Sequence, residues 1–89
     1  MRVPRALGLL QRIAATNEID EDRLAKELVV SPETLRLYKT GEREIPLARQ
    51  MCIAKLAIES FPKLAREGYT LRNQVSAAIS VDRNMTLKA

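Results

Sequence analysis

Hydrophobic residues recur every three or four positions along most of the chain, which is the spacing of one face of an α-helix. The marks of β-strands, clusters of β-branched residues and strict alternation, are missing, and glycine occurs only at positions 8, 41 and 68. The pattern therefore predicts an all-α fold, a compact bundle of about five short helices.

Capping residues and prolines divide the first half of this pattern into three helices. The first is expected over residues 4–15, followed by a short connection. Asp20 is a suitable N-cap for a second helix over 21–28, and Ser31 with the proline after it begins a third, which ends at Gly41. The predicted inward-facing positions of the three helices are Leu7, Leu10, Ile13, Ala14, Leu24, Ala25, Leu28, Leu35 and Tyr38.

The second half predicts a fourth helix over about 46–60, a turn that closes at Gly68, and a fifth helix capped by Thr70. One stripe of the fourth helix holds Leu47, Met51, Ala54, Ile58 and Phe61, while Ile53 and Leu56 fall on its otherwise polar side. The fifth helix has an apolar face of Leu71, Val75, Ala78 and Ile79, and this pattern ends at Asp82. We expect one domain over 1–81 and a flexible C-terminal tail over 82–89.

Composition narrows the possible functions. Histidine is absent and aromatic residues make up only 3% of the chain, which argues against histidine-based catalysis, most zinc sites and base-stacking platforms. No glycine-rich phosphate loop and no nucleophile with a base partner is present, so we expect neither an enzyme nor a cofactor. The apolar run over 6–10 is too short for a signal peptide or a membrane span, and a single cysteine fits a reducing compartment. A cytoplasmic location is expected.

The predicted helices over 21–28 and 31–40 lie only about three residues apart, which is typical of a helix-turn-helix. In that motif the two helices cross steeply and pack through a fixed set of apolar and small positions. The stretch IDEDRLAKELVVSPETLRLY over 19–38 supplies such a set, namely Leu24, Ala25, Leu28, Val30, Leu35 and Tyr38.

This stretch resembles the phage repressor and Cro type of helix-turn-helix domain, in the xenobiotic-response-element-like family. The resemblance rests on the Leu-Ala pair, the Val-Ser turn, the two anchors that follow, and the exit Thr40-Gly41-Glu42-Arg43, and it covers roughly residues 7–60. It implies a helix-turn-helix proper at about 20–40. It also implies sequence-specific binding of double-stranded DNA by a small prokaryotic or phage-type transcriptional regulator, with repression as the expected effect.

The resemblance makes 31–40 the recognition helix. In this interpretation Arg36 reads guanine or grips a phosphate, Leu37 touches a thymine methyl, and Thr34 donates to a phosphate or a base edge. Lys39 and Arg43 are expected where the DNA backbone passes the end of the helix. The full set of implied DNA-contacting residues is Ser31, Glu33, Thr34, Arg36, Leu37, Lys39, Thr40 and Arg43.

Two features depart from the family's pattern. Val29 stands where the family commonly has glycine, and because left-handed backbone is costly for a β-branched residue, it favours a turn of a different shape. The chain has a net charge of +4, yet residues 31–45 hold three basic and three acidic side chains. Glu21 and Asp22 add negative charge nearby. This balance opposes tight DNA binding.

A second class of function therefore stays open: a protein-interaction module, or an antitoxin-like partner, with the same fold and weak or no DNA binding. A lone module would bury only about 600–1,000 Å² against DNA, so we expect a homodimer. The apolar positions available for its interface are Ile53, Leu56, Leu71, Val75 and Ile79. The alternative is that these positions cover one another inside a single chain.

Overall fold

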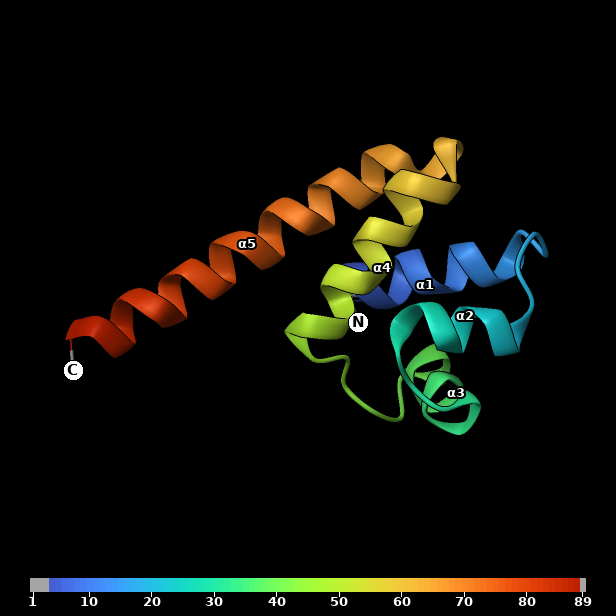
Figure 1. The fold of residues 1–89 in the computed structure, drawn as a ribbon, viewed down its shortest axis with the longest axis horizontal. Helices are drawn as coiled ribbons and strands as arrows, with labels where there is room; N and C mark the ends of the chain where they lie inside the picture. The colour runs from blue at the N-terminus through green and yellow to red at the C-terminus, as the bar shows by residue number, and fades with distance from the viewer. Residues whose placement is uncertain (1–3, 89) are drawn as a thin grey trace.

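The computed structural model describes the backbone of residues 4–88 and the side chains of residues 4–80. Its elements are α1 (Arg5–Ala15), α2 (Glu21–Leu28), α3 (Pro32–Thr40), α4 (Leu47–Ser60), the short 3₁₀ helix η1 (Pro62–Leu64) and α5 (Ala65–Lys88) (Figure 1). No strand occurs in the described part of the chain. The predicted all-α bundle with a central helix-turn-helix arrangement is confirmed. No helix among the described residues combines the length and the hydrophobicity needed to cross a membrane.

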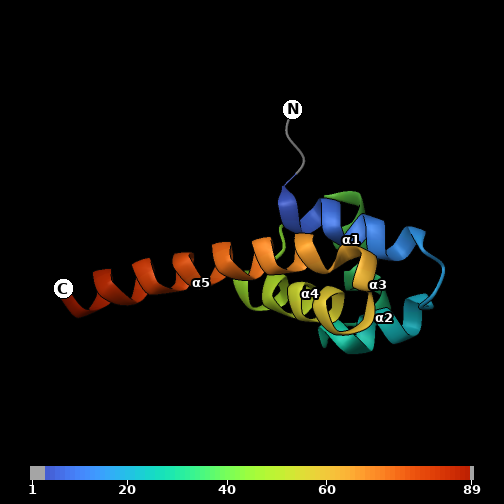
Figure 2. The same ribbon diagram turned by 90° about the horizontal axis from the view of Figure 1, so that it is seen from above.

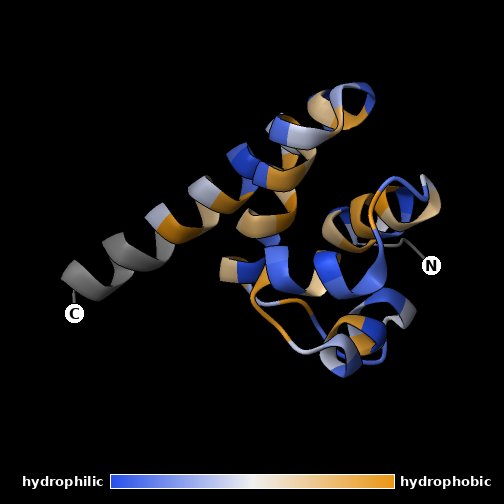
Figure 3. Ribbon diagram, turned by 45° about the vertical axis from the view of Figure 1, so that its right-hand side comes forward, coloured by the Kyte–Doolittle hydropathy of each residue, from blue (hydrophilic) through white to orange (hydrophobic). Residues whose placement is uncertain are grey.

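The fourth helix lies at the centre of the molecule, where it contacts α1, α2 and α5. Its most extensive interface is with α5, which returns alongside it in the opposite direction (Figure 2). Hydrophobic residues gather where the helices meet and polar residues lie on their outer sides (Figure 3). Because α4 is covered from more than one side, its apolar residues are needed around much of its circumference.

The predicted inward face of α4 was partly wrong for this reason. Ile53 and Leu56, placed on the polar side by the helical wheel, are buried, whereas Leu47, Met51 and Ile58 are only half-buried. A single-stripe wheel assumes one covering surface, and α4 has several.

The predicted boundaries of the fifth helix were also wrong. The helix begins at Ala65, runs through Gly68 without a turn, and its backbone is helical to Lys88. A Cβ atom at Gly68 would lie 2.9 Å from the Ala54 carbonyl oxygen and 2.9 Å from Ile58 Cγ1. Gly68 therefore permits the close approach of α5 to α4, and it does not end a turn. The predicted flexibility of 82–89 stays a prediction.

The residues expected to form a dimer interface belong to the core of one chain. Leu71 and Val75 are 1% exposed, Ile53 is fully buried, and Leu56 is nearly so. Ile79 is half-buried and packs against the same core. For Ile53, Leu56, Leu71 and Val75, the alternative in which these positions cover one another within the monomer is the one observed. The homodimer itself stays a prediction.

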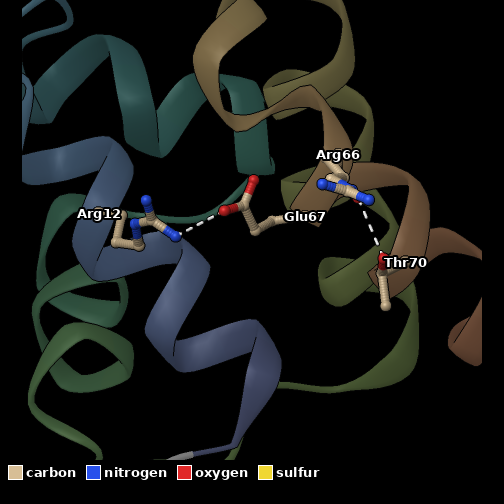
Figure 4. Close-up of polar contacts among 4 residues, drawn as sticks. All are labelled: Arg12, Arg66, Glu67 and Thr70. Carbon is tan, nitrogen blue, oxygen red and sulfur yellow. Dashed lines mark hydrogen bonds and ion pairs between the residues drawn. The ribbon is translucent and has the colours of Figure 1, made fainter.

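An ion pair joins the first helix to the last. The Nη1 group of Arg12 donates to Oε1 of Glu67 over 2.7 Å, across 55 positions of sequence (Figure 4). One turn along α5, the Thr70 hydroxyl donates to the carbonyl oxygen of Arg66. A backbone hydrogen bond at Glu67 and the neighbouring Arg12 hold the pKa of the Glu67 carboxyl below its ordinary value of 4.5. Both side chains are partly solvated, so the contact contributes little to the stability of the fold.

Candidate nucleic-acid interface

Two capped helices make up the helix-turn-helix segment. The Asp20 carboxylate accepts a hydrogen bond from the backbone N–H of Arg23 (2.7 Å), and the Ser31 hydroxyl oxygen accepts one from the N–H of Thr34 (3.1 Å). Pro32 occupies the first turn of α3, where its missing N–H costs no helical bond. Both predicted N-caps are therefore confirmed, and they fix the start of each helix to a single residue.

The turn between α2 and α3 has the left-handed conformation that a glycine would usually adopt. Val29 has φ 57° and ψ 47°. The N–H of Val30 donates to the Ala25 carbonyl and the N–H of Val29 to the Lys26 carbonyl, each over 3.0 Å, which is the Schellman pattern of a helix end. The expected turn of a different shape was wrong: the backbone keeps the glycine conformation and the valine bears the strain.

One face of α3 is fixed on the body of the protein. Leu35 is fully buried and Tyr38 is 5% exposed, as predicted. The side-chain amide of Gln11, on α1, donates to the carbonyl oxygen of Lys39 (2.9 Å). Gly41 then ends the helix with φ 81°. The helix is held along its inner face and at its C-terminal end.

The opposite face of α3 is open to solvent. Glu33 and Arg36 on this face are exposed, and so is Arg43 in the loop that follows the helix. Neither arginine forms an ion pair with a carboxylate among the described side chains. Both guanidinium groups are thus available to an external partner such as a phosphate or a base edge.

The remaining site residues of the prediction are engaged within the protein. The hydroxyl groups of Ser31 and Thr34 bond each other over 3.0 Å, and that of Thr40 donates to the Leu37 carbonyl and lies 3.1 Å from a Glu42 oxygen. Leu37 itself is half-buried. Ser31, Thr34 and Thr40 therefore support the shape of α3 first, and a contact with a ligand would have to share or replace these bonds.

Charge around the helix is mixed. Lys39 Nζ lies 3.1 Å from Oε1 of Glu21, at the start of α2. This pair neutralises one of the three cations predicted to contact DNA. Exposed carboxylates of Glu33, Glu42 and Glu44 lie in the same segment and offset its positive charge. The cations of this segment that no ion pair engages among the described residues are Arg36 and Arg43.

Sequence reasoning missed two residues that position this face. Gln11 holds the C-terminal end of α3, and Glu21 binds Lys39. Both side chains are polar residues on helix surfaces, and the sequence carries no signal for a contact made between residues 18 or 28 positions apart. Only the packing of α1 and α2 against α3 reveals them.

Other parts of the surface offer little for chemistry. No cluster of three metal-ligating side chains occurs among the residues whose side chains are described. An open cavity of about 260 Å³ is lined by residues from 18–27 and 56–61, including Arg23, Glu27 and Phe61, and includes no residue of α3. The exposed face of α3 therefore remains the strongest candidate site.

The fold and this face define a small all-α protein with a helix-turn-helix segment. Comparison with known proteins finds no match: no family model fits the chain, and no curated protein or solved structure matches it. The resemblance to phage repressors therefore stays a hypothesis that rests on the residues of the segment itself.

Proposed function

We propose that this protein binds double-stranded DNA through α3 and acts as a small transcriptional regulator of prokaryotic or phage type. One observation carries the proposal: α3 is fixed by its inner face and its C-terminal end, while Arg36 is presented from the outer face to solvent. A rigid helix with one free face suits the major groove of B-DNA, and arginine can donate two hydrogen bonds to guanine O6 and N7. Repression by occupying a promoter is the simplest action of such a protein.

Selection of bound duplexes from a random-sequence library tests the proposal. We expect enrichment of one short motif, and an affinity for the enriched duplex that falls steeply with salt, because bound phosphates release counterions. Arg36→Ala should weaken binding by about 1–3 kcal/mol and relax the preference at one base pair. Arg66→Ala, the same charge change on an exposed position of α5, is the matched control and should retain the motif.

Failure to enrich any motif, together with equal binding by both variants, would contradict the proposal. A uniform loss across all sequences with Arg36→Ala would instead assign this side chain to a phosphate, and the slope of binding against salt should then shrink by about one.

The carboxylates around α3 favour a second candidate, a protein-interaction or antitoxin-like module with weak or no DNA binding. Glu21, Glu33, Glu42 and Glu44 would repel phosphates but would suit a basic protein surface. Binding of a duplex at low salt separates the two candidates: a protein module would show neither a motif nor a steep salt dependence.

A regulator of this size is expected to act as a homodimer, since two copies double the contacts and space two recognition helices by about 34 Å, one turn of DNA. Because Ile53, Leu56, Leu71 and Val75 are buried within one chain, such a dimer would form through other residues. Sedimentation equilibrium with and without the selected duplex measures the number of copies.

A further inference from the structure

Val29 combines two properties that the fold does not require of it. Its side chain is 67% exposed, the most exposed of the large hydrophobic side chains described. Its backbone is left-handed, with φ 57° and ψ 47°. Left-handed backbone disfavours β-branched residues most strongly, because Cβ crowds the neighbouring carbonyl.

Nothing in the part of the chain that the structure describes offsets this strain. An exposed isopropyl group adds no core burial, whereas the next residue, Val30, packs partly against the core and so explains its own apolar character. Glycine or asparagine at position 29 would keep the two Schellman hydrogen bonds, which need only the backbone. The side chain of Val29 is therefore a cost to stability, and strained residues of this kind concentrate at sites of function.

The position of Val29 indicates which part of a DNA duplex its side chain would contact. It lies two residues before Ser31, the N-cap of α3. In a helix-turn-helix bound to DNA, the N-terminal end of the second helix is the end that approaches base edges. The apolar group that a base edge offers in the major groove is the C5 methyl of thymine.

Resting on the DNA-binding function proposed above, we propose that Val29 is a specificity-determining residue, whose isopropyl group packs against a thymine methyl beside the bases that α3 reads. The contact adds preference for thymine at one position and needs no hydrogen bond. It also explains an exposed valine at a position where glycine would fold more readily.

A cycle of protein and DNA changes tests this contact. The selected duplex is prepared with each thymine replaced in turn by deoxyuridine, which removes only the methyl group. We expect one such replacement to weaken binding of the natural protein by about three- to tenfold. Val29→Gly and Val29→Asn, which both tolerate the left-handed turn, should weaken binding of the thymine duplex by a similar factor and lose nothing further on that deoxyuridine duplex.

Three other outcomes would each overturn a different part of the proposal. An equal loss for the two variants on thymine and deoxyuridine duplexes would move the contact to deoxyribose carbons and overturn the thymine assignment. Unchanged affinity of both variants would overturn the role of Val29 while leaving DNA binding intact. Failure of the natural protein to bind any selected duplex would overturn the proposed function and this inference with it. Circular dichroism of each variant confirms that the fold is retained.

Discussion

Single residues at the ends of α2 and α3 determine where each helix starts and stops. Asp20 and Ser31 cap the two N-termini with side-chain oxygens, and Gly41 and Val29 occupy left-handed positions at the two C-termini. Three of these four residues suit their positions by type. Val29 alone does not, because its β-branched side chain disfavours the left-handed backbone and so raises the free energy of the turn.

Replacement of Val29 by glycine should therefore stabilise the protein. We expect a gain of about 1 kcal/mol, because relief of the left-handed strain exceeds the extra entropy of glycine in the unfolded chain. In a domain of this size that gain corresponds to a rise in Tm of about 4–8 °C. Thermal unfolding followed by circular dichroism measures it. Val30→Gly is the control and should destabilise, since Val30 packs on the core and has no positive φ. A lower Tm for Val29→Gly would mean that the isopropyl group stabilises the turn.

The sequence predicted the caps and anchors of the site because each is a local property of residue type and spacing. Asp20, Ser31, Leu35 and Tyr38 all lie as expected. The shape of the turn was not predictable from Val29 itself, because the packing of α2 against α3 overrides the residue's own preference. The roles of Gln11 and Glu21 depend on contacts between helices, which no local pattern encodes.

At the level of whole elements, the close approach of α5 to α4 depends on Gly68. The neighbouring α4 atoms are the Ala54 carbonyl oxygen and the side chains of Ala57 and Ile58. The sequence favoured a turn at Gly68 because glycine usually interrupts helices. That Gly68 faces Ala54 and Ala57 is visible only in the packed structure. The same misreading placed the start of the fifth helix near Thr70.

Gly68→Ala should destabilise the protein, against the usual gain of about 1 kcal/mol for this change in a helix. The added Cβ would stand 2.9 Å from a backbone oxygen that cannot rotate away, so we expect a net loss of about 1–3 kcal/mol in the free energy of unfolding by urea. Ser76→Ala, at an exposed position of the same helix, is the control and should be neutral or slightly stabilising. A stabilised Gly68→Ala protein would show that the two helices can separate without cost.

The ion pair between α2 and α3 reduces the positive charge available to DNA. Glu21→Gln frees Lys39 and removes a carboxylate near the exposed face of α3, so affinity for a duplex should rise by about two- to fivefold at low salt, or roughly 0.4–1 kcal/mol. Fluorescence anisotropy of a labelled duplex measures the change. Glu59→Gln, the same charge change at an exposed position near the end of α4, should give a smaller effect. Equal effects of both variants would mean that only net charge matters.

For the molecule as a whole, a residue that is buried within one chain cannot also contact a second copy of the protein. The sequence showed apolar positions on two helices but not whether they face each other or a second copy, because both arrangements bury the same side chains. Leu71 and Val75 face α4 of their own chain. The core therefore includes residues from more than one side of α4.

Leu71→Asp should therefore unfold the protein instead of producing a folded monomer. A carboxylate at a site that is 1% exposed lacks water and a partner, and its cost of several kcal/mol is comparable to the total stability of a small domain. We expect loss of the helical circular dichroism signal at 25 °C. Asn73→Asp, two positions along on the exposed side of α5, introduces the same charge and should leave the signal unchanged. A folded Leu71→Asp protein of reduced mass in sedimentation would restore the interface assignment.

The hairpin of α4 and α5 also determines the order in which the chain is expected to assemble. These helices are consecutive and joined by a single 3₁₀ turn, so their large interface forms by closing a short loop. The α2–α3 segment makes smaller interfaces with the rest, and one of its ties, from Gln11 to Lys39, spans 28 positions. The hairpin is therefore expected to form early and the α2–α3 segment to dock late. The segment proposed to read DNA is then expected to open more readily than α4, and its backbone amides should exchange with solvent before those of α4.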